Sequence, residues 1–173
     1  MRNIPLTIIG LLFLTIGPLN AQPLTEAQQR ARAKAQAQIM ADAFLKQDLD
    51  KFISYMNPLL VKKMGGKDSL LHKFQKGWLE ITKPIRSETI GEASAIFKTK
   101  ADIQCIVPQT MVANYGTGEH ALTTQMIAIS RDGGKQWTFI DAGISVQQLN
   151  YIKSLSVNLS PELEKLLRER LMN

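Results

Sequence analysis

The spacing of hydrophobic residues changes at Pro84, and this change constrains the fold more than any other feature of the sequence. Before Pro84, apolar residues recur at intervals of three and four, which is typical of amphipathic helices. After Pro84 they alternate with polar residues, and Ile, Val, Thr, Phe and Tyr become frequent, which is typical of β-strands. A run of helices followed by a run of strands predicts an α+β fold.

The helical half begins with a strong start signal. Thr25 and Gln28 have the spacing of a capping box, and the residues that follow are rich in Ala, Gln, Arg and Lys. Asp68 or Ser69 is expected to cap the last helix before Pro84. The predicted helices cover residues 24–47, 51–56, 58–64 and 70–82.

The second half predicts an antiparallel sheet, because the loops between its strand-like runs are short. The predicted strands cover residues 85–93, 94–100, 102–115, 120–130 and 136–142. Pro108 predicts an edge position or a bulge in the third strand. Two short helices follow, and Ser160 is expected to cap the second. We expect the N-terminal helices to pack on a curved antiparallel sheet, with the helices on one face.

Residues 1–21 are typical of a secretory signal peptide. Arg2 supplies a basic start, an apolar run follows, and Ala21 ends it before a polar segment. The run contains two prolines and is shorter than a membrane span needs. We therefore expect cleavage after about Ala21, a single domain over residues 22–173, no stable membrane span after cleavage, and a secreted or periplasmic location.

Composition excludes several classes of protein. The formal net charge is +6, but no run of five or more Lys or Arg residues occurs, so a nucleic-acid groove is not expected. The single cysteine, Cys105, cannot form an internal disulfide and lies in an apolar run, which favours a buried thiol. Stability must therefore come from the apolar core.

Residues 130–137, SRDGGKQW, contain one recognisable local motif. Ser130, Asp132, Gly134 and Trp137 fill the positions of the S-x-D-x-G-x-x-W pattern, and the segment resembles the Asp-box of sialidases and related propellers. That box is a hairpin corner without catalytic groups. It occurs once here, whereas a propeller needs several blades of about 40–50 residues. A structural corner is therefore the prediction.

The mature chain as a whole resembles the nuclear transport factor 2-like superfamily. The layout of helices followed by a meander matches, and the segment ADAFLKQDLDKF, residues 41–52, is similar to a common start in that superfamily. RDGGKQWTFID near the last strand fits exported bacterial members. The resemblance implies a cone-shaped domain with an apolar pocket. The superfamily includes enzymes, transport proteins and scaffolds, so it implies no activity, and no catalytic residue is carried over.

Few residues predict chemistry. His72 and His120 have no second ligand at metal-binding spacing, and neither a G-x-S-x-G nucleophile motif nor a P-loop occurs. We expect no metal and no cofactor. Asp141 is the one candidate catalytic residue, since it follows an apolar strand and a buried carboxyl has a raised pKa. A strand-end carboxylate facing water is the alternative.

Five side chains are predicted to converge on one apolar pocket of ~300–1,000 Å3 between helices and sheet. They are Tyr55, Met56, Trp78, Tyr115 and Phe139. The same residues could instead fill the core. The sequence thus favours an exported module that binds a small apolar ligand or a protein partner. The alternative is a small pocket enzyme, an isomerase, dehydratase or hydrolase that uses a single carboxylate such as Asp141.

Overall fold

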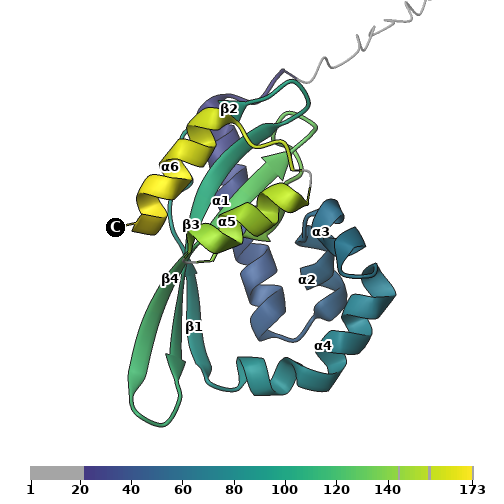
Figure 1. Cartoon of the computed structure of the whole chain (residues 1–173), viewed down its shortest axis with the longest axis vertical. Coiled ribbons are helices and arrows are strands. Elements are labelled where there is room, and N and C mark those ends of the chain that lie inside the picture. The colour runs from purple at the N-terminus through teal and green to yellow at the C-terminus, as the bar shows by residue number, and fades with distance from the viewer. Residues whose placement is uncertain (1–21, 144, 156, 173) are drawn as a thin grey trace, which may run out of the picture.

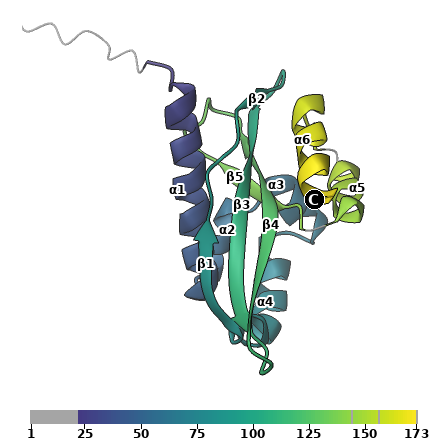
Figure 2. The same ribbon diagram turned by 90° about the vertical axis from the view of Figure 1, so that its left-hand side faces the viewer.

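A computed structural model describes residues 22–143, 145–155 and 157–172, and it confirms the predicted α+β fold. A five-stranded antiparallel sheet lies between α1 on one face and two C-terminal helices on the other (Figures 1 and 2). In chain order the elements are α1 (Glu26–Leu45), α2 (Leu49–Tyr55), α3 (Pro58–Lys63), α4 (Lys67–Thr82), β1 (Ile85–Ile90), β2 (Phe97–Lys98), β3 (Ile103–Asn114), β4 (Glu119–Ser130), β5 (Thr138–Asp141), α5 (Val146–Ser154) and α6 (Pro161–Met172).

The helix start signals are confirmed with one exception. The Thr25 hydroxyl accepts from the Gln28 N–H at the start of α1, and the Gln28 side chain bonds back, which completes the capping box. The prediction that Asp68 or Ser69 caps α4 is wrong. Gly66 holds the N-cap position with a φ of 88°, a conformation that favours glycine, so the helix begins before Asp68 without a side-chain cap.

The sheet has the order β1-β3-β4-β5, and β2 also pairs with β3. The prediction that Pro108 marks an edge or a bulge is wrong, because β3 is an inner strand that pairs with β4 in unbroken register. The Pro108 carbonyl accepts from the Gly91 N–H, just past the end of β1. Because the nitrogen and carbonyl of a residue in an antiparallel strand point to the same side, the Pro108 nitrogen also faces the end of β1. The missing N–H of Pro108 therefore lies where the ladder stops, and no hydrogen bond is lost.

The two faces of the sheet pack against different helices. Alternating residues of β3 show this, since Cys105 and Val107 pack toward α1 whereas Ile106 packs toward α5 and α6. The expectation that all helices share one face is therefore wrong for α5 and α6. A separate cluster joins α2, α3 and α4 around Ile53 and Leu70.

The turn at residues 130–137 is a structural corner, as predicted. The Asp132 carboxylate accepts from the N–H groups of Lys135 and Gln136 at 3.0 Å each and from the Ser130 hydroxyl at 2.8 Å. The Trp137 indole N–H donates to the Gly134 carbonyl at 3.0 Å, and the Trp137 side chain is buried. The motif residues thus bond to one another, and the turn is held closed.

The same corner is anchored to α1. Gln36 donates to the Lys135 carbonyl at 2.8 Å and accepts from the Trp137 N–H at 2.8 Å, and Gln29 donates to the Gly133 carbonyl at 3.1 Å. These bonds fix the first half of α1 against the turn between β4 and β5.

The C-terminal helices are attached through a buried amide. Gln104, fully buried on β3, donates to Asp102 and to the Asn158 carbonyl and accepts from the Ser160 N–H. Ser160 then caps α6, as predicted, by accepting from the Leu163 N–H. Each polar atom of this side chain is satisfied, so Gln104 can lie in the core beneath α6.

Candidate functional site

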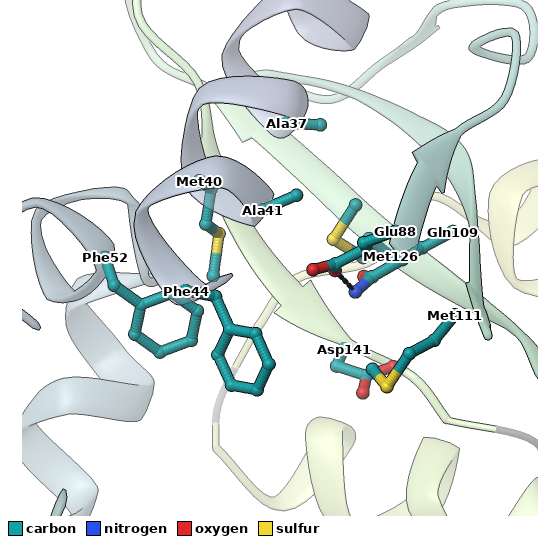
Figure 3. A pocket seen from close by; sticks show the side chains of 10 residues that line it. All are labelled: Ala37, Met40, Ala41, Phe44, Phe52, Glu88, Gln109, Met111, Met126 and Asp141. Carbon is teal, nitrogen blue, oxygen red and sulfur yellow. Dashed lines mark hydrogen bonds between the residues drawn. The ribbon is translucent and has the colours of Figure 1, made fainter. Parts of the chain in front are cut away.

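A cavity of about 170 Å3 lies between the second half of α1 and the sheet (Figure 3). It is smaller than the range predicted from the sequence. Its walls are mainly alanine, methionine and phenylalanine side chains. The lining residues are Ala37, Met40, Ala41, Phe44, Phe52, Glu88, Gln109, Met111, Met126 and Asp141.

The local structure explains which side chains reach the cavity. On α1, Ala37, Ala41 and Met40 with Phe44 recur at intervals of three and four and so lie on one helix face. On the sheet, Glu88 of β1 pairs with Met111 of β3, and Met126 of β4 pairs with Asp141 of β5. Paired residues point to the same side of a sheet, so residues from four strands face α1 together.

Glu88 is the most perturbed polar group in the cavity. Its Oε1 accepts a hydrogen bond from the Gln109 side chain, whereas its Oε2 is buried and has no hydrogen-bond partner among the described residues. Burial raises the pKa of Glu88 to about 7, although the bond from Gln109 opposes this shift. The negative charges of Asp42 and Asp141 raise the pKa further. Glu88 therefore exchanges a proton near neutral pH.

Asp141 is placed differently. Its Oδ1 accepts from the Gly143 N–H at 2.7 Å, and the residue is exposed although it lines the cavity. Figure 3 shows the Glu88 carboxyl group turned toward α1, and the Asp141 carboxyl group beside Met111. The cavity thus has two acids in different environments, the half-buried Glu88 and the exposed Asp141.

The arrangement has two chemical capabilities. The apolar walls can hold a small ligand, while Glu88 and Gln109 can fix its polar group. A carboxyl with a pKa near 7 can also act as a general acid or base at neutral pH. None of the ten described lining residues is Lys, Arg, His or Tyr, so the cavity holds no cationic side chain.

The five pocket residues predicted from the sequence are not brought together in this cavity. Phe139 is 1% exposed in the core, with the half-buried Tyr55 ring 6.5 Å away between centroids. Met56 is buried among the helices and forms a bridge to Phe139. Tyr115 is 70% exposed in the turn after β3. Ligand contact by these residues stays a prediction.

Trp78 lies directly behind the cavity wall. Its ring packs against Phe44 at 4.7 Å and Phe52 at 5.2 Å between centroids, and its indole N–H donates to the Phe44 carbonyl. Both phenylalanines line the cavity on their other side. Trp78 therefore positions the wall of the cavity without lining it.

The sequence prediction missed Glu88 and Gln109. Glu88 has the same parity as the buried Ile90, so alternation alone would have turned it inward. The signal was weak because β1 is mostly polar and its pairing shifts between Ile85 and Ser87. Gln109 follows Pro108, where an irregular strand was expected.

Other candidate chemistry is limited. Cys105 is buried as predicted, and burial raises the pKa of its thiol to about 12. Within the part of the chain that the structure describes, no group of three or more His, Cys, Asp or Glu side chains is placed to hold a metal ion. No helix in residues 22–143, 145–155 or 157–172 has the length and hydropathy required to cross a membrane.

Comparison with known proteins shows similarity to solved structures only. No protein-family model and no curated protein matches the chain. A domain of unknown function with a cystatin-like fold from Nostoc punctiforme PCC 73102 is similar at 12% identity and a TM-score of 0.45, over 84% of this chain and 95% of that one. An NTF2-like protein of unknown function from Burkholderia pseudomallei K96243 is similar at 13% identity and a TM-score of 0.35, over 73% and 98%. TerC, co-crystallised with polyporic acid, is similar at 10% identity and a TM-score of 0.34, over 73% and 99%. No site residue is transferred from them.

Proposed function

We propose that this chain binds a small, mostly apolar molecule in the cavity between α1 and the sheet. The observation that carries the proposal is the Oε2 of Glu88, which is buried in an apolar wall without a hydrogen-bond partner among the described residues. Leaving a buried polar atom unpaired costs about 1–3 kcal/mol, and a ligand that donates a hydrogen bond there would recover that free energy. Glu88 thus serves as the polar anchor and the methionine and phenylalanine side chains as the apolar walls.

The volume limits the ligand. An apolar protein cavity of about 150 Å3 holds benzene, so a cavity of about 170 Å3 accepts a molecule of similar size. Asp141 is exposed and neither Tyr nor His lines the described cavity, which favours binding over catalysis.

Thermal unfolding with toluene and benzyl alcohol tests the proposal. A ligand at ~100 times its Kd adds about 2.7 kcal/mol, which for a domain of this size is expected to raise the melting temperature by roughly 5–11 °C. Ala41→Leu should abolish the shift, because the larger side chain occupies the cavity. Ala31→Leu is the matched control, since it makes the same change on the exposed face of α1. No shift in the wild-type protein, or an equal shift in both variants, would contradict the proposal.

A second candidate is a small pocket enzyme that uses Glu88 as a general base, with Asp141 as the alternative carboxylate. The observation that favours it is the pKa of Glu88, about 7, which suits proton abstraction at neutral pH. With cyclohexanone in D2O, the enzyme is expected to accelerate exchange of the α-hydrogens, followed by NMR. The rate should rise with pH through about 7, fall sharply in Glu88→Gln, and persist in Glu119→Gln, an exposed control. Exchange no faster than buffer would contradict this candidate.

We also propose that the protein is exported and loses residues 1–21, which lie outside the described residues. The basic Arg2, the apolar run and Ala21 support this proposal. Mass spectrometry of the intact protein from the periplasm or medium should give a chain that begins at Gln22. A chain that keeps Met1 or Arg2 would contradict it.

A further inference from the structure

The charges around the cavity all have the same sign. Glu88 and Asp141 line it, and Asp42 on α1 is close enough to raise the pKa of Glu88. Gln109 is the remaining polar lining residue, and its amide already donates to Glu88. No described lining residue is cationic, although the chain as a whole has a formal net charge of +6. The cavity therefore has a negative local potential within a basic protein.

The walls suit a cation that carries an apolar body. Phe44 and Phe52 present aromatic rings, and a ligand cation is attracted to the face of such a ring. Met40, Met111 and Met126 add polarisable sulfur atoms from three different elements. A fully apolar ligand would leave Oε2 of Glu88 without a hydrogen-bond partner, and an anionic ligand would face like charge.

We propose that the cavity selects a small primary amine in its ammonium form, with the nitrogen at Glu88 Oε2 and the apolar body against Phe44 and Met40. The proposal rests on the proposed function, since it names the ligand class of the same cavity. Figure 3 shows the required placement, with the Glu88 carboxyl group facing the α1 side chains across the cavity. Benzylamine has the appropriate size, because it is a benzene ring with one short amine arm.

Binding of an ammonium ion is linked to the proton on Glu88. The ion favours the carboxylate form, so below pH 7 its binding releases the proton that Glu88 carries. The facing groups from the neighbouring elements are Asp42 on α1, Asp141 on β5 and the Gln109 amide on β3. Affinity for the amine should therefore rise from pH 5 to about pH 7 and then level off.

Isothermal titration with benzylamine, benzyl alcohol and benzoate separates the ligand classes. At pH 8, benzylamine is expected to bind at least ~tenfold more tightly than benzyl alcohol, as is typical of a hydrogen bond to a charged group. Benzoate should not bind. At pH 6, titrations in two buffers of different ionisation enthalpy should show proton release with benzylamine and none with benzyl alcohol.

Glu88→Gln keeps the shape of the side chain and removes its charge. It should remove the preference for benzylamine over benzyl alcohol and abolish proton release. Glu119→Gln, which removes the same charge at an exposed position, should change neither. Thermal unfolding of each variant verifies that it is folded.

The outcomes distinguish the two proposals. If benzyl alcohol binds as tightly as benzylamine, or Glu88→Gln keeps the preference for the amine, the amine proposal is overturned and the binding function stands. If none of the three compounds nor toluene binds, both are overturned.

Discussion

The α1 face of the sheet is packed with alanine and methionine around a carboxyl group, whereas the α5–α6 face is packed with isoleucine and leucine. On the first face, Ala37, Ala41 and Met126 surround Glu88, and a cavity remains. On the second face, Ile127 and its neighbours interlock with fully buried leucines of α5 and α6. Short and unbranched side chains leave space that branched side chains fill. We therefore expect ligand binding to depend on the α1 face, and stability to depend more on the packing of the α5–α6 face.

Leu163→Ala should give the largest effect that separates the two faces. Leu163 is fully buried on α6, so its truncation should reduce the free energy of unfolding by about 2–5 kcal/mol, measured by urea denaturation. The affinity of the folded protein for benzyl alcohol should not change, because the cavity lies on the other side of the sheet. A loss of affinity without a loss of stability would reverse the assignment of the faces.

Glu88→Gln, a change on the α1 face, should increase the free energy of unfolding instead of reducing it. The native protein keeps the Glu88 proton up to about pH 7, whereas the ordinary pKa of the group is 4.5, so wild-type stability falls as pH rises between these values. The variant avoids this loss. It should be more stable than wild type by about 1–3 kcal/mol at pH 8, after allowance for partial exposure. The difference should vanish near pH 4.5.

Urea denaturation of both proteins at pH 4.5, 6 and 8 measures this difference, and Glu119→Gln is the exposed control. A difference that does not depend on pH would show that Glu88 ionises normally in the folded protein.

The corner at residues 130–137 should give the smallest effect. Asp132→Ala removes the acceptor for two backbone N–H groups and should cost about 1–2 kcal/mol. Gly134→Val should also destabilise, because Gly134 has a φ of 93° and a Cβ would lie 2.7 Å from Gln29 Cγ. Both variants should keep ligand affinity, measured by titration. An unchanged stability with lost affinity would make the corner part of the binding site.

Acid should weaken the same corner. Partial burial raises the pKa of Asp132, but the N–H groups of Gln136 and Lys135 and the Ser130 hydroxyl lower it more, so the net shift is downward. The stabilisation is therefore present at neutral pH and is lost as pH falls below the ordinary Asp pKa.

The elements could be predicted from the sequence where the signal was local. The Thr25 capping box, the Ser160 cap and the Asp132 corner each depend on residues within a few positions, and each is confirmed. The position of each strand in the sheet could not be predicted, because it depends on pairing between residues far apart in the sequence. Pro108 is tolerated in an inner strand because β1 ends beside it. The residues around Pro108 do not reveal which strand lies beside it or where that strand ends.

The cavity has the apolar character expected from the sequence, but its lining residues differ from the five predicted ones. An apolar pocket with a carboxyl group was expected, and Asp141 does line the cavity. Trp78 was expected inside the pocket and lies one layer behind it, because large aromatic residues are as suited to a core as to a ligand. Glu88 was missed because β1 is mostly polar and its pairing shifts near its start, so the alternation that turns Glu88 inward was a weak signal.

The bonds between α1 and the corner join residues far apart in the chain. Gln36 bonds to Trp137 across 101 positions, and Gln29 bonds to Gly133 across 104. A ribosome that adds about 5–20 residues per second needs roughly 5–20 s to synthesise that interval. During this time α1 has been made but the strand turn that anchors it has not. The part of α1 that packs on β4, β5 and their turn has no partner until these residues are made, so we expect these distant contacts to be among the last to form.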